Sequence, residues 1–152
     1  MSHTVSAPPG RGGFRLFTDD FVLLSVPSGI SGRSIAQKYV DEIKSKVAEF
    51  NGQPWAHIVY LNEWQLGTPE VEPIITELSR WCLANNLKYT AIIETANSVR
   101  QYQNNKMLIK QNERTDYDRQ SFANADLAIE WLNSLGFRVS ERIPELLKEY
   151  SY

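Results

Sequence analysis

The two acidic side chains of this 152-residue sequence that could do acid/base chemistry lie where predicted strands end. Glu63 lies in the loop that follows the apolar run at 55–61, and Glu94 ends the run at 89–94. Two carboxylates at neighbouring strand ends could form an acid/base pair or bind a cation. Side chains in such positions are more often solvated loop charges, so we expect neither a catalytic role nor a metal here.

The histidine and cysteine content also favours binding over catalysis. His57 lies within an apolar run, where a lone histidine is usually a hydrogen-bonded core residue, and the sequence does not pair it with any serine or cysteine. Cys82 falls on the apolar stripe of a predicted helix, where a thiol behaves as a small hydrophobe. Two His and one Cys cannot build a four-ligand zinc site or a disulfide framework. We therefore expect no enzymatic activity and no cofactor.

A glycine-containing segment at 27–33, PSGISGR, joins a predicted strand to a predicted helix. Its backbone N–H groups and Arg33 could hold an anion at the start of that helix. The segment matches neither G-x-x-x-x-G-K-[ST] nor G-x-G-x-x-G, the patterns typical of nucleotide-binding loops. We interpret Gly29 and Gly32 as residues that a sharp strand-to-helix turn requires.

Two residues of the next loop, Trp64 and Thr68, have more than one interpretation. Thr68 precedes Pro69 and Glu70, an order typical of a helix N-cap followed by a first turn, and we interpret its hydroxyl as that cap. Phosphorylation of Thr68 is the alternative, because a phosphate would meet the positive end of the helix. Trp64 is too large to leave in water, so it either folds back on the core or belongs to a contact surface.

Alternating strands and helices position these residues. Two β-favouring runs at 14–17 and 21–26 flank an Asp-rich turn and predict a hairpin. Further strands are predicted at 55–61, 89–94 and 119–122, and helices at 32–50, 69–84, 97–111, 125–135 and 140–150. Strands that alternate with helices pair in parallel through right-handed crossovers. The order therefore predicts an α/β fold with a mostly parallel sheet and an antiparallel hairpin at its start.

The two ends of the chain differ from its centre. Residues 1–12 are rich in Pro and Gly without apolar periodicity, so we expect a flexible arm. Residues 13–152 are predicted to form a single domain, with a core at 13–137 and an added helix at 140–150. We expect this helix to pack on the sheet of its own chain, and packing on another subunit is the alternative. No run approaches the ~20 apolar residues of a membrane-spanning helix, and no secretory signal is recognisable. We expect a cytoplasmic protein without membrane insertion.

The net charge of the chain argues against nucleic acid as a partner. The 16 basic and 18 acidic residues nearly balance, which gives no bulk reason to expect nucleic acid as a partner.

Two stretches carry a resemblance to a known family. The first, GFRLFTDDFVLLSVPSG at 13–29, combines a strand, an Asp-Asp turn and a second strand that leads to Gly29 and a long helix. The second, FANADLAIEWL at 122–132, places Ala128 against the sheet and Trp131 at the end of the helix. Together they resemble STAS domains, more closely the SpoIIAA-like branch of small bacterial proteins. The resemblance implies a STAS/SpoIIAA-like sandwich with an extra C-terminal helix.

The resemblance also implies a role. In signalling members of the family, a partner kinase phosphorylates a Ser or Thr at the start of the second helix, the element in which Thr68 lies. It implies a non-enzymatic regulatory or protein-interaction domain, whose partner is another protein or a second copy in a homodimer. The alternative is a domain that binds a small apolar or lipid-like molecule, because the wider fold group resembles lipid-carrying domains of the Sec14 type.

We expect the ligand or partner surface at the carboxyl ends of the strands, where open α/β sheets bind their ligands. Thr68 is the candidate phosphoacceptor beside it. The candidate surface consists of residues from three loops: Gly29, Ser31, Gly32, Arg33, Asn62, Glu63, Trp64, Gln65 and Glu94.

Overall fold

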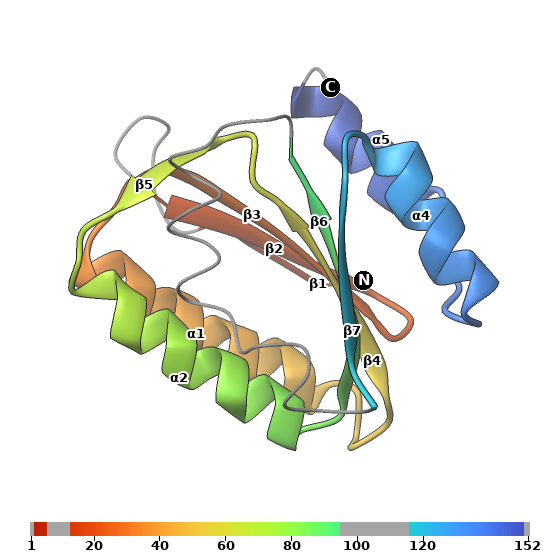
Figure 1. Ribbon diagram of the computed structural model, residues 1–152, viewed down its shortest axis with the longest axis horizontal. Coiled ribbons are helices and arrows are strands. Elements are labelled where there is room, and N and C mark those ends of the chain that lie inside the picture. The colour runs from red at the N-terminus through yellow and green to blue at the C-terminus, as the bar shows by residue number, and fades with distance from the viewer. Residues whose placement is uncertain (1, 6–12, 95–115, 151–152) are drawn as a thin grey trace.

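A single β-sheet separates two helical layers (Figure 1). The structure is a computed structural model that describes residues 2–5, 13–94 and 116–150. Neighbouring strands follow the order β1-β2-β3-β4-β6-β7, and β5 pairs with β3 beside this path. The strands are β1 (Ser2–Val5), β2 (Gly13–Asp19), β3 (Val22–Ser31), β4 (Trp55–Tyr60), β5 (Trp64–Gly67), β6 (Leu87–Ile93) and β7 (Asp118–Phe122).

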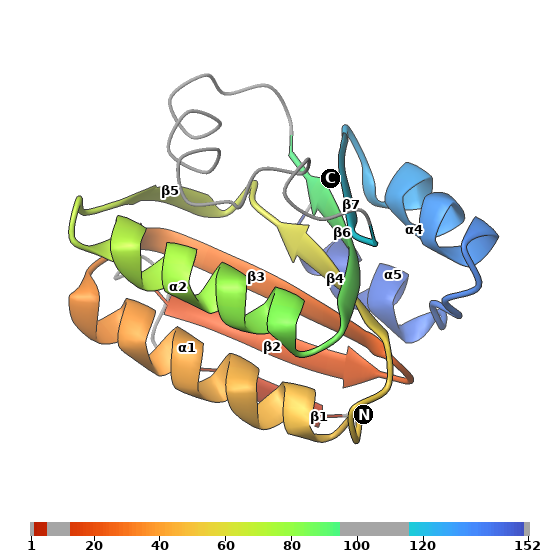
Figure 2. The same cartoon turned by 60° about the horizontal axis from the view of Figure 1, so that its bottom comes forward.

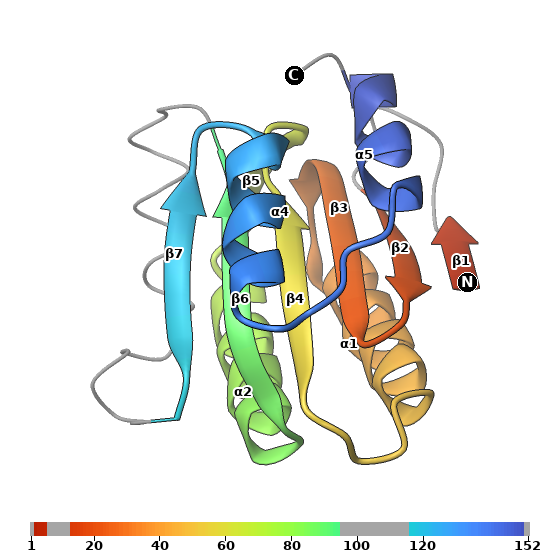
Figure 3. The same ribbon diagram turned by 90° about the vertical axis from the view of Figure 1, so that its right-hand side faces the viewer.

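Helices cover both faces of the sheet. In Figure 3, α4 (Ala125–Ser134) and α5 (Arg142–Leu147) lie in front of the strands, while α1 (Arg33–Ala48) and α2 (Val71–Ala84) lie behind them. A short 3-10 helix, η2 (Lys148–Tyr150), follows α5. Strands β3, β4, β6 and β7 are parallel, and β1, β2 and β3 are antiparallel. The predicted α/β fold is confirmed, while the helix predicted at 97–111 lies outside the described residues.

Strand β4 is covered by helices on both faces, as its nearly continuous apolar sequence predicts. Trp55 packs in the layer of α1 and α2, whereas Ala56, Ile58 and Tyr60 pack in the layer of α4 and α5. The alternation follows from the two-residue period of a strand. Consequently His57 and the other odd-numbered residues of β4 face α1 and α2.

Two short strands differ from the sequence prediction. Residues 2–5 pair antiparallel with β2, with Ser2 opposite Thr18, so this part of the predicted flexible arm is an edge strand. Residues 64–67, predicted as a loop, form β5 and pair in parallel with the end of β3. Strands of four residues carry too little periodicity to be recognised, and their pairing depends on partners distant in sequence.

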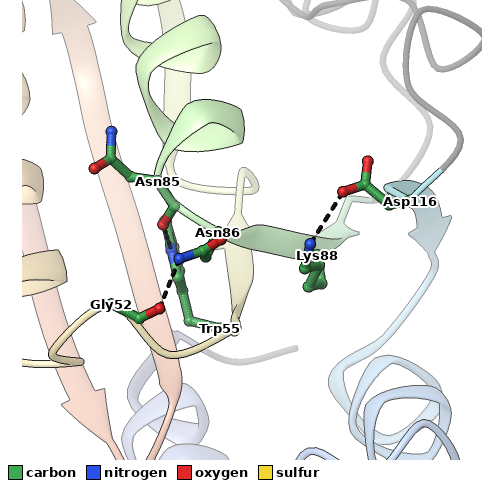
Figure 4. A network of polar contacts seen from close by, with 6 residues as sticks. All are labelled: Gly52, Trp55, Asn85, Asn86, Lys88 and Asp116. Carbon is green, nitrogen blue, oxygen red and sulfur yellow. Dashed lines mark hydrogen bonds and ion pairs between the residues drawn. The ribbon is translucent and has the colours of Figure 1, made fainter.

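The turns at the amino ends of β4 and β6 are held together by polar contacts (Figure 4). The indole Nε1 of Trp55 donates to the backbone carbonyl of Asn85 at 2.8 Å, and Asn86 Nδ2 donates to the carbonyl of Gly52 at 2.6 Å. Asn86 has a φ of 72°, a conformation that ends a helix, which confirms the predicted stop after α2. This end of the sheet lies opposite the candidate loops and fixes the strands that carry them.

The C-terminal helix packs on the sheet of its own chain. Ile143 and Leu147 of α5 are completely buried in the cluster that includes β4 and α4. Outside this cluster, the Arg15 guanidinium of β2 pairs with Glu149 at 3.1 Å. Helix α5 is therefore part of the core rather than an appendage.

Candidate functional site

A row of polar side chains crosses the sheet beneath α1 and α2, within an otherwise apolar layer. Ser25 of β3 hydrogen-bonds Nε2 of His57 on β4, and Thr90 on β6 is the register partner of His57. The Tyr117 hydroxyl donates to Thr90 Oγ1 at 2.9 Å, and the Tyr39 hydroxyl of α1 hydrogen-bonds Ser25. We call these five residues the polar row. Of these five residues the sequence singles out only His57, because the other four side chains carry no local signal.

Burial keeps the polar row uncharged. Loss of hydration lowers the pKa of His57 to about 3 and raises the pKa of both Tyr39 and Tyr117. A neutral imidazole has one donor and one acceptor nitrogen, so the Ser25 hydroxyl can partner Nε2 in either tautomer. A histidine that resists protonation this strongly is a poor general base near neutral pH, even beside a serine hydroxyl.

A cavity of about 120 Å³ lies between the polar row and the two helices α1 and α2. Figure 2 shows these helices side by side across the sheet. His57, Val59 and Thr90 line the cavity from the sheet, and apolar side chains of both helices line it from above. His57 and Val59 keep partial exposure at the centre of the sheet, whereas Ala56 and Ile58 on the opposite face are 0% exposed. This difference marks the cavity as space that water-sized molecules can occupy.

Cys82 of α2 also borders this cavity. Its side chain is buried, and burial raises the pKa of its thiol to about 12. A thiol that stays protonated is a weak nucleophile. Cys82 is therefore a small buried side chain in the wall of the cavity, as the sequence predicts.

Two of the candidate loops meet where the last residues of β3 pair with β5. The backbone N–H of Gly29 donates to the carbonyl of Glu63 at 2.9 Å, which joins two of the predicted loops. Trp64 is only 4% exposed and packs with Ala36 and Val71, so it folds back on the core instead of forming an exposed surface.

Burial divides the remaining candidate residues into accessible and inaccessible groups. Glu94 is 8% exposed, and its backbone N–H donates to Phe122. Gly29 is also buried, while Arg33 and Gln65 are exposed. Gly32, Asn62 and Glu63 are half-buried, and Ser31 ends strand β3. Only part of the predicted surface is therefore accessible to a protein partner.

Thr68 does not cap helix α2, contrary to the sequence prediction. The helix begins at Val71, its N-cap position is Glu70, and no side chain caps it. The Thr68 hydroxyl instead donates to the Glu70 carboxylate at 3.4 Å, while its carbonyl accepts from Val71. Because of a turn at 68–70, the helix begins two residues later than the sequence predicts. The predicted cap at Asn124 is confirmed, because its Oδ1 accepts from the Leu127 N–H at 3.0 Å.

These two residues predict different effects on stability. Asn124→Ala should lower the free energy of unfolding by about 1 kcal/mol, because a backbone N–H loses its acceptor. Thr68→Ala should change it by less than about 0.5 kcal/mol, because no cap is lost. Urea unfolding of both variants measures the difference. Equal losses would show that Thr68 caps the helix in solution.

The two glycines of the 27–33 segment also differ. Gly29 has a φ of 67°, which side chains disfavour. Gly32 has a φ of -112°, and a Cβ at that position would meet nothing within 4 Å. The prediction that the turn requires both glycines is therefore wrong for Gly32, whose extended backbone any residue can adopt.

Substitution of each glycine tests this distinction. Gly29→Ala should lower the free energy of unfolding by about 1–2 kcal/mol, the penalty for a left-handed residue with a side chain. Gly32→Ser should leave it unchanged or raise it by a few tenths of a kcal/mol, because serine can cap α1. Thermal or urea unfolding of the two variants provides the comparison, and a large loss for Gly32→Ser would contradict it.

Within 2–5, 13–94 and 116–150, no three His, Cys, Asp or Glu side chains gather closely enough to hold a metal ion. In this described part of the chain, no helix has the length and hydrophobicity needed to cross a bilayer.

The fold matches that of a solved structure described as SpoIIAA-like, which confirms the predicted architecture. The chain is similar to the crystal structure of an uncharacterized DUF3478-family protein from Shewanella loihica PV-4, with 16% identity and a TM-score of 0.58. That match covers 87% of this chain and 96% of the other. It is also similar to an anti-sigma factor antagonist from Mycobacterium paratuberculosis, with 13% identity and a TM-score of 0.53 over 84% and 99% of the two chains. Comparisons with protein-family models and with curated sequences give no match.

Proposed function

We propose that this chain is a regulatory domain that acts by binding another protein. The observation that supports the proposal is its fold, which it shares over 84% of its length with a protein described as an anti-sigma factor antagonist. The low reactivity expected of His57 and Cys82 is consistent with binding rather than catalysis.

The proposed partner surface lies around the ends of β3 and β5. Arg33 is exposed beyond the end of β3 and Gln65 is exposed on β5, while Glu63, directly before β5, is half-buried. The backbone hydrogen bond of Gly29 and the buried ring of Trp64 hold these loops in place before a partner binds. A preorganised surface loses less conformational entropy on association. Arg33 is positively charged and Glu63 is negatively charged, so the surface suits a partner that presents an acidic and a basic side chain at matching positions.

Site-specific photo-crosslinking tests this surface. A photoreactive amino acid at Gln65 should capture a second polypeptide in the host cell, and the same group at exposed Glu130 on α4 should not. The mass of the adduct distinguishes another protein from a second copy of this chain. Equal capture at both positions, or none at Gln65, would contradict the proposal.

Phosphorylation of Thr68 is the proposed means of regulating this surface. Thr68 is half-buried and lies one residue beyond β5, so a phosphate would change the charge beside Gln65. The nearby Glu70 carboxylate opposes this charge, while the start of α2 favours it. Intact mass of protein from its host should reveal a phosphoform that Thr68→Ala abolishes. Its absence under all growth conditions would overturn this part of the proposal.

The cavity supports a second candidate function, which is binding of a small apolar molecule. Its walls are mostly apolar, and its floor carries hydrogen-bonding groups, the combination typical of ligand sites. Native mass spectrometry of protein from its host should show a co-purified ligand. Val59→Phe, which fills the cavity from β4, should remove it. A ligand retained by this variant would place the binding elsewhere.

A further inference from the structure

We propose that the cavity above the polar row binds a neutral molecule about the size of one aromatic ring, whose hydroxyl group hydrogen-bonds with His57. This inference rests on the second candidate function and narrows the ligand class. It differs from the lipid-like ligand considered from the sequence. Size, charge and hydrogen bonding each support it separately.

The volume of the cavity limits the size of the ligand. Its volume is about 120 Å³, and an apolar cavity of about 150 Å³ is known to accept benzene. Sites for drug-sized molecules occupy roughly 300–1,000 Å³, so the space between the polar row and the two helices is too small to hold a whole molecule of that size. A single six-membered ring is therefore the appropriate scale.

The chemistry of the lining excludes a charged ligand. No Asp, Glu, Lys or Arg occurs among the described residues that line the cavity. His57 remains neutral because burial holds its pKa at about 3. A carboxylate or ammonium group in this cavity would lose its hydration without gaining a counter-ion, a penalty of several kcal/mol. The ligand should accordingly be uncharged at neutral pH.

Two hydrogen-bonding groups of the polar row have no partner among the described residues, so the ligand should carry one polar group. Nε2 of His57 is occupied by Ser25, and among the described residues Nδ1 has no hydrogen-bond partner. Thr90 accepts from Tyr117, but within the same part of the chain its own hydroxyl proton has no acceptor. Buried groups of this kind are normally satisfied by protein, water or ligand. A ligand hydroxyl both donates and accepts, so it matches His57 in either tautomer.

Phenol, toluene and benzoate provide a matched test, because they share a ring and differ in hydroxyl and charge. Calorimetric titration of the full chain should give a dissociation constant for phenol about fivefold below that for toluene, the equivalent of one hydrogen bond. Benzoate should not bind measurably. His57→Leu should abolish the preference for phenol over toluene.

Two variants control for folding and for binding elsewhere. Val59→Phe should abolish binding of phenol and toluene without lowering the thermal unfolding midpoint, because the added ring occupies the cavity. Ser121→Ala, at an exposed position on β7, should bind phenol as the wild type does.

The remaining outcomes separate this inference from the function on which it rests. Binding of palmitate that Val59→Phe abolishes, with weak or no binding of phenol, would overturn the neutral single-ring ligand but retain a ligand-binding cavity. Benzoate binding as tightly as phenol would overturn the neutral ligand alone. No binding of any of the four probes would overturn both the inference and the second candidate function.

Discussion

Leu147→Ala is expected to lower the free energy of unfolding by about 2–5 kcal/mol, although the residue lies near the end of the sequence. Leu147 of α5 is 0% exposed and packs with Ile143, Leu132 and the residues of β4 that face α4. Its truncation removes apolar contacts and leaves a cavity in the core. Equilibrium urea unfolding measures the loss.

Leu127→Ala is the matched control for this substitution. Leu127 lies on neighbouring α4 but is 49% exposed, so its truncation should change the free energy of unfolding by no more than about 0.5 kcal/mol. Equal stability of both variants would mean that α5 does not pack on its own sheet in solution.

Acid should destabilise the protein through His57. The pKa of His57 is about 3 in the folded state, below the value near 6.5 expected in the unfolded state. Between these values the unfolded chain binds a proton that the folded chain excludes, so protonation favours unfolding. The stability contributed by neutral His57 is therefore complete above about pH 6.5 and is lost as the pH falls toward 3.

The size of this effect follows from the same linkage. Below pH 6 the wild type should lose up to about 1.4 kcal/mol per pH unit more than His57→Asn, which keeps a hydrogen-bonding group but does not titrate. Urea unfolding of both proteins at pH 7, 6, 5 and 4 measures the two slopes. Parallel curves would show that His57 takes up a proton in the folded state, as a water-exposed ring would.

The polar row points to a function because these side chains stabilise the core less well than aliphatic side chains would. Ser25, His57 and Thr90 face an apolar helical layer, where aliphatic side chains would pack without unsatisfied hydrogen-bonding groups. Departures from the apolar pattern of a core tend to mark functional sites. The cavity lies against this row, which is why we connect the two features.

The sequence predicts the long elements of the fold well. Helices α1, α2 and α4 each carry a clear apolar stripe, and β4 and β6 each form an apolar run. The β2–β3 hairpin is confirmed, with Asp20 at a φ of 53° in its two-residue turn. The sequence instead predicts an arm where β1 forms and a loop where β5 forms, and it places the start of α2 two residues too early. These features depend on pairing with β2 and β3 and on the turn at 68–70 rather than on local periodicity.

The sequence by itself determined the order of the longer strands and helices in the described part of the chain, and it excluded disulfides and a four-ligand zinc site. Only the tertiary structure decided which polar residues meet. Ser25 and His57 are 32 positions apart, and Thr90 and Tyr117 are 27 apart, yet both pairs are in hydrogen-bond contact. Each crossover between parallel strands contains a helix or a long connection, so residues on neighbouring strands are necessarily distant in sequence. Periodicity reports which face of a strand is buried, whereas contact between two strands depends on their pairing and register.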